Sequence, residues 1–160
     1  MIIPESNARI IENPLFIEVP MVTRKMKSQF LEAVHQEKII ELPTFPVLCD
    51  SEEEVKGCLV FEIELDHMSP LYMPTSKLLV KQIPKQNWNN LKSGVYAVNY
   101  KNTLLTIKRV RDNTLPENNT LTLYANPHAR GDSSITLSNE DINHIWKAEK
   151  IVSAPLPVND

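Results

Sequence analysis

The chain has 160 residues, of which 42% are hydrophobic and 23% charged, a composition typical of a folded domain rather than a disordered chain. Its 17 basic and 20 acidic residues give a net charge of −3, which argues against a nucleic-acid binder held by overall positive charge. Three glycines cannot supply the clustered loops that cradle nucleotide phosphates, and no apolar run is long enough for a membrane helix.

The first 55 residues are predicted to form an N-terminal arm and a linker-like segment. Residues 16–19 are predicted to be a short strand that ends at Pro20, and residues 24–41 are the one window with helical spacing of apolar residues. Residues 42–47 should run extended, because prolines keep the residues before them out of the helical region. Residues 50–56 are acidic and are predicted to be a loop.

Residues 56–160 are predicted to form a mostly-β domain on which the N-terminal arm packs. Apolar and polar residues alternate there in short runs, which predicts strands at residues 61–65, 78–80, 95–98, 104–110 and 121–123. Residues 99–102 fit the turn of a hairpin, and residues 112–120 a polar loop. Residues 142–152 fit either a last strand or a short helix that opens at Ser138.

Charge is distributed unevenly along this domain. Residues 67–111 contain no acid and eight basic residues, whereas residues 37–66 carry nine acids against two lysines. We expect the two stretches to face each other or to be solvated, and the alternative is a partner-binding patch.

Four motifs in order carry a resemblance to a known family. Leu65-Asp66-His67-Met68-Ser69-Pro70 resembles the Gly-Asp-Ser-Met-x-Pro motif of the LexA and lambda-repressor C-terminal domains, which are self-cleaving serine peptidases. Residues 91–98, with Gly94, resemble the next strand of that family, and residues 105–110 resemble the strand that brings in its catalytic lysine. Residues 121–127 resemble the strand that ends in Asn126-Pro127.

The resemblance implies a LexA/signal-peptidase-like β fold and a serine–lysine catalytic pair. A serine hydroxyl attacks only when a base takes its proton, and a lysine acts as that base when burial lowers the pKa of its amine. Lys108 matches the family's lysine, but His67 occupies the place of the serine. Ser69 is the rival nucleophile, although its backbone starts about 6–7 Å away from the matching position. The Ala-Gly or Cys-Gly bond that family members cut occurs nowhere in the chain.

We therefore expect a degenerate peptidase that is not an enzyme, acting as the regulatory and dimerisation domain of a phage-repressor-like transcription regulator in the cytoplasm. DNA would be bound only through a helix-turn-helix domain absent from this chain, because residues 1–60 offer a single helical window. Two alternatives remain: an active peptidase that uses Ser69 and Lys108, and an accessory nucleic-acid-binding protein that uses the basic stretch. We expect no cofactor and no metal, since His35, His67, His128 and His144 are scattered singly.

The last predicted element is the proposed dimer interface. Residues 142–152 carry apolar residues in both alternation registers, as a strand does when it packs on the core with one face and on a partner with the other. Ile145 or Trp146 would then anchor a homodimer. The alternative is that a loop or the N-terminal arm covers the second face.

Overall fold

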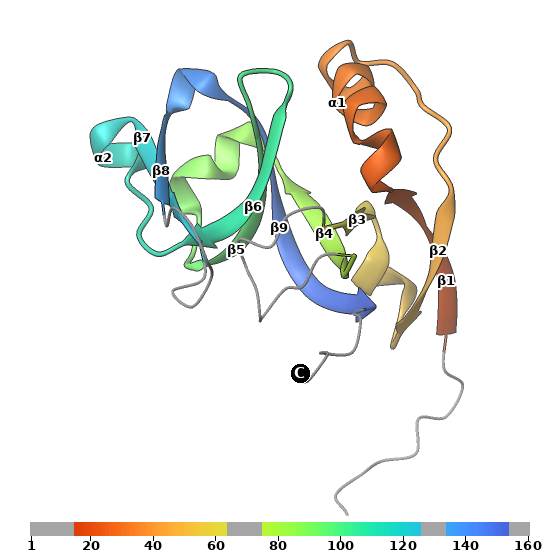
Figure 1. Cartoon of the computed structure of the whole chain (residues 1–160). Helices are drawn as coiled ribbons and strands as arrows, with labels where there is room; N and C mark the ends of the chain where they lie inside the picture. The colour runs from red at the N-terminus through yellow and green to blue at the C-terminus, as the bar shows by residue number, and fades with distance from the viewer. Residues whose placement is uncertain (1–14, 64–74, 126–133, 154–160) are drawn as a thin grey trace, which may run out of the picture.

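The computed structural model describes residues 15–63, 75–125 and 134–153, and within them it shows one mixed sheet of nine strands (Figure 1). The mostly-β prediction is confirmed. The strand order is β2-β1-β3-β4-β9-β5-β6-β7-β8, and β1 and β3 form the one parallel pair among these neighbours. The strands are β1 (Leu15–Val22), β2 (Thr44–Cys49), β3 (Cys58–Glu62), β4 (Lys77–Ile83), β5 (Gly94–Tyr100), β6 (Leu104–Val110), β7 (Thr120–Tyr124), β8 (Ser134–Ser138) and β9 (Ile142–Ser153).

The N-terminal segment contributes directly to this sheet. β1 and β2 pair antiparallel, from Leu15 opposite Cys49 onward, and the end of β1 then pairs with β3. The predicted helix is shorter than residues 24–41: a 3-10 turn η1 (Arg24–Met26) leads into α1 (Lys27–His35). The helix stops because Glu37 takes a left-handed φ of 54°, after which the chain runs toward Pro43, which precedes β2.

The predicted hairpin is present as β5 and β6, with Tyr100 opposite Leu104. Its turn carries Lys101 and Asn102 at φ 47° and 66°, a conformation that asparagine tolerates better than most residues. The side-chain amide of the buried Asn99 donates to the Asn102 carbonyl at 3.1 Å and to the Leu104 carbonyl at 2.9 Å, which fixes the turn from below.

Residues 142–152 form a strand, which decides between the two predicted alternatives. β9 has 12 residues and lies between β4 and β5, so it joins the two halves of the sheet. β8 was not predicted, because its alternation of Ile135 and Leu137 with three hydroxyl side chains spans only five residues. Four further short helical turns lie between strands in the described residues: η2 (Glu52–Val55), η3 (Lys85–Asn90), α2 (Leu115–Asn118) and η4 (Asn139–Asp141).

Apolar side chains are buried on both faces of the sheet. One cluster lies inside the curl of β5 to β9, where Trp88 packs with Tyr96, Leu121 and Ile145. A second cluster lies under α1, where Phe30 meets Phe61 and Trp146 at ring-centroid distances of 5.7 and 5.9 Å. A third lies between β1, β2, β3 and η2, and contains both cysteines. The two ends of the molecule therefore share one sheet but bury separate cores.

Candidate functional site

Lys108 is buried, whereas lysine side chains normally keep their ammonium groups in water. Its side chain is 4% exposed and shares a face of β6 with Thr106 and Val110. Tyr96 lies directly opposite on β5, and its hydroxyl donates to the Lys92 carbonyl at 2.8 Å. Burial raises the pKa of Tyr96, so the phenol stays neutral. This strand position holds the Lys108 side chain away from bulk water.

The other members of the predicted site lie outside the described residues. These are Asp66, His67, Met68, Ser69 and Pro70 of the first motif, and Asn126 and Pro127 of the last. The ends that flank the first motif are described: the Ile63 amide donates to the Ser76 carbonyl at 2.8 Å, and the Thr75 amide donates to the Ile63 carbonyl at 2.9 Å. The pairing of Lys108 with His67 or Ser69 therefore stays a prediction.

The structure describes the surroundings of two further residues of the compared motifs, Gly94 and Ser76. Gly94 begins β5 opposite Val110, and a Cβ there would meet only the Tyr96 ring edge at 3.8 Å, which is ordinary contact. Ser76 is 1% exposed, and its hydroxyl has no hydrogen-bond partner among the described residues. A buried hydroxyl without a partner costs free energy, so Ser76, six residues after the first motif in sequence, is a polar group left unsatisfied by the described residues.

Ile145 and Trp146 already fill the core of the single chain, which corrects their prediction as interface anchors. Ile145 is 0% exposed on one face of β9, and Trp146 is 2% exposed on the other, with its ring 5.2 Å from that of Phe61. The alternative that the N-terminal arm covers the second face is what the structure shows, because α1 places Phe30 there. Dimerisation itself stays a prediction without these two anchors.

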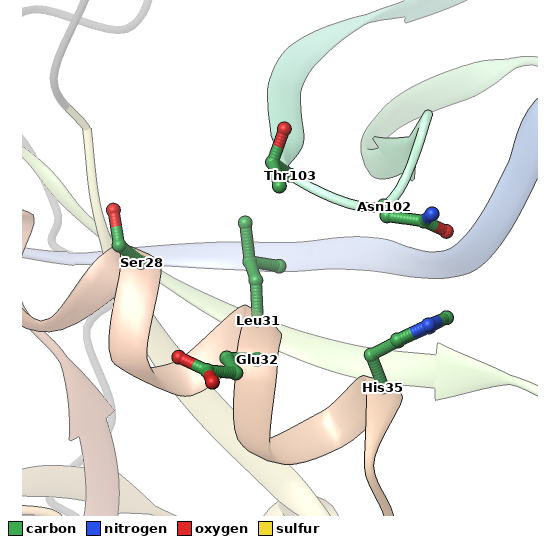
Figure 2. Close-up of a pocket in the computed structure, with 6 residues that line it drawn as sticks. All are labelled: Ser28, Leu31, Glu32, His35, Asn102 and Thr103. Carbon is green, nitrogen blue, oxygen red and sulfur yellow. The ribbon is translucent and has the colours of Figure 1, made fainter.

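A cavity of about 250 Å³ lies between α1 and the β5–β6 turn (Figure 2). Leu31 and His35 point from the helix toward the turn residues Asn102 and Thr103, and β9 passes behind them. Two hydrogen bonds hold the turn against β9: the Asn102 backbone N–H donates to Asn143 Oδ1 at 2.7 Å, and Asn143 Nδ2 donates to Asn102 Oδ1 at 3.0 Å. The cavity was not predicted, because its walls are about 70 residues apart in sequence and no local pattern joins them.

His144 of β9 lies near His35, one of the residues that line this cavity. Its ring is 5.7 Å from Trp146, and its Nδ1 is 3.4 Å from the Gln82 amide nitrogen. Burial lowers the pKa of His144, and the nearby His35 of α1 lowers it further. Both effects favour the neutral ring while α1 is in place.

Neither cysteine forms a disulfide, and both are buried in the third cluster. Burial raises the pKa of Cys58, which Lys81 opposes and Glu149 reinforces. A buried neutral thiol is a small apolar filler rather than a nucleophile. Among the described residues, no three His, Cys, Asp or Glu side chains are grouped to hold a metal ion.

Comparisons of the chain with protein-family models, with curated proteins and with solved structures found no match. Within the described residues, no helix has the length and apolar character needed to cross a membrane.

Proposed function

We propose that this chain is a non-cleaving regulatory and dimerisation domain of a phage-repressor-like transcription regulator, descended from a Ser–Lys self-cleaving peptidase. The observation that carries the proposal is the buried Lys108 on β6, opposite Tyr96. Lysine is almost never fully buried unless its amine has a partner or a chemical role. Lys108 is also the residue that the sequence resemblance matches to the family's lysine.

The sequence supplies the reason for expecting no cleavage. His67 stands in place of the nucleophilic serine, and the chain contains no Ala-Gly or Cys-Gly bond to cut. An imidazole acyl adduct hydrolyses readily and does not reproduce the reach of a hydroxyl. A domain that lost nucleophile and scissile bond together would keep its β scaffold for assembly rather than for catalysis.

Incubation at about pH 10, where an unperturbed lysine is partly neutral, tests this directly. Intact-mass analysis after prolonged incubation should show one full-length species. Two fragments that separate within residues 20–60, and that disappear in Lys108→Ala, would instead establish the alternative peptidase that uses Ser69.

The proposed dimerisation is tested separately, by measuring the oligomeric state. Two-fold operators require the regulator to present two DNA-binding heads, so the domain should be a homodimer. Sedimentation at micromolar concentration should give about twice 18.3 kDa. A monomer under these conditions would remove the dimerisation role, and an in-frame helix-turn-helix sequence upstream of Met1 would support the regulator.

A further inference from the structure

Five residues form a continuous row across five neighbouring strands. The strand registers place Cys58 opposite Lys81, Lys81 opposite Lys147, Lys147 opposite Tyr96, and Tyr96 opposite Lys108. Directly opposite residues in a sheet share a face, so all five point to the same side. Lys81 is exposed and Lys147 half-buried, so at the middle of the row two lysines stand directly opposite each other on the neighbouring strands β4 and β9.

A third lysine on the same face shows how this surface accepts a carboxylate. Leu79 lies two residues before Lys81 and directly opposite Lys150, so Lys150 belongs to the same face, beyond the bulge of β9. The Lys150 ammonium donates to Glu54 Oε1 at 2.6 Å and to the Leu48 carbonyl at 3.0 Å. The acidic segment η2 thus neutralises one lysine of this surface from within the chain. We call Lys81, Lys147 and Lys150 the lysine face.

Lys81 and Lys147 receive no such partner. Neither forms an ion pair with any described residue. Glu149 lies close enough to this row that its charge helps to raise the pKa of Cys58 and of Tyr96, but it is exposed and pairs with neither lysine. Like charges directly opposite each other on antiparallel strands destabilise the sheet. Among the described residues this like-charge contact is left without an ion pair, and an external anion would relieve it.

We propose that the lysine face binds an acidic peptide segment of a partner protein, whose carboxylates lie between Lys81 and Lys147 as Glu54 lies against Lys150. An extended peptide with acids at alternate positions presents its carboxylates on one side, which suits two neighbouring ammonium groups. A nucleic acid suits the surface less well, because its binding needs several phosphate contacts and the chain as a whole is negative. The inference does not depend on self-cleavage or on dimerisation.

The first experiment uses the full chain and the acetylated peptide Glu-Ser-Glu-Ser-Glu, with Gln-Ser-Gln-Ser-Gln as the uncharged control. We expect the acidic peptide to shift the backbone amide NMR signals of β4 and β9 around Lys81 and Lys147, and the shifts to weaken as salt is added. The glutamine peptide should leave these signals in place. Equal shifts from both peptides would overturn the proposal.

Variants of opposite sign give the sharper test. Lys81→Gln and Lys147→Gln should each weaken binding by about two- to fivefold, the range for pairs at a protein surface. Glu54→Gln should strengthen it, because it releases Lys150 to the peptide. Lys38→Gln removes an exposed lysine from the loop after α1 and should change nothing. Equal loss in Lys38→Gln, or no gain in Glu54→Gln, would contradict a site at this face.

Thermal stability separates binding from folding. Lys81→Gln removes the like-charge pair, so its unfolding temperature should equal or exceed that of the parent while peptide binding falls. A loss of binding that follows a loss of stability would reduce the effect to unfolding and overturn the proposal. Two further outcomes would show that the lysine face binds something other than an acidic peptide. Tighter binding of a short DNA duplex at the same salt would identify a nucleic acid, and concentration-dependent shifts of the β4 and β9 signals without peptide would identify a second copy of the chain.

Discussion

His144 couples the docking of α1 to protonation. The groups around its ring are His35 from α1, Gln82 from β4, Asn99 directly opposite on β5, and Trp146 on its own strand. None of these is an acid, so nothing described here compensates a charge on the imidazole. Burial first, and His35 second, lower the pKa of His144 below its ordinary value of 6.5.

The sign of the pH effect follows from this lowered pKa. Above about pH 6.5 the ring is neutral in both the folded and the unfolded chain, so it adds nothing to the pH dependence. Below that value the unfolded chain binds the proton more readily, and stability falls until pH passes the lower pKa of the folded state. We expect the urea midpoint of the parent to drop more between about pH 7 and pH 5 than that of His144→Asn. Equal drops in the two proteins would contradict it.

Single residues were predicted unequally well, for physical reasons. Lys108 could be placed because strand alternation fixes which side chains share a face with Val110, and the resemblance named the position. Ile145 and Trp146 were misassigned because alternation shows that both faces of a strand are apolar but not what covers them. The covering group, Phe30, lies more than a hundred residues away in the chain, on another element.

At the scale of elements, α1 is held by a few large side chains on one face. Phe30 is 4% exposed and meets Phe61 edge-on and Trp146 at an angle, and Leu31 beside it is 1% exposed. Phe30→Ala should lower the free energy of unfolding by about 3–5 kcal/mol, the usual cost of emptying a core aromatic site. Gln29→Ala, an exposed neighbour on the same helix, should stay within about 0.5 kcal/mol in urea titrations. A small effect of Phe30→Ala would mean that α1 contributes little to the fold.

Element boundaries show where local pattern stops being informative. The β5–β6 hairpin was predicted because alternation and turn residues agree, and the side chain of Asn99 then secures the turn. The helix was predicted too long, since Ile40 continues the apolar spacing but packs on the second cluster from the irregular loop after α1. The spacing of apolar residues indicates which residues are buried, and a loop that packs on the same core can show the same spacing as a helix.

At the scale of the whole molecule, the sheet is continuous across the predicted division at residue 55. β1 pairs with β3 across that boundary, and Lys150 near the end of β9 bonds to Glu54 and to the Leu48 carbonyl. Two of the nine strands and α1 come from before residue 55, and α1 covers the apolar face that holds Phe61 and Trp146. Sequence composition marked the boundary because the prolines and acids cluster there, whereas pairing across it depends on contacts that composition does not record.

A chain that begins at residue 56 should therefore fail to form the native core. It would leave β3 as an unpaired edge and expose Phe61 and Trp146, which favours aggregation. We expect it to bind a hydrophobic dye and to lose the cooperative urea transition of the full chain. The matched control is the full chain cut once at Ile39, a fully exposed residue between α1 and β2. Its two pieces should stay associated through β1, β2 and α1, because the cut removes no buried contact. If the chain from residue 56 unfolds cooperatively at the same urea concentration as the nicked protein, the N-terminal segment is an appendage and residues 56–160 are a domain on their own.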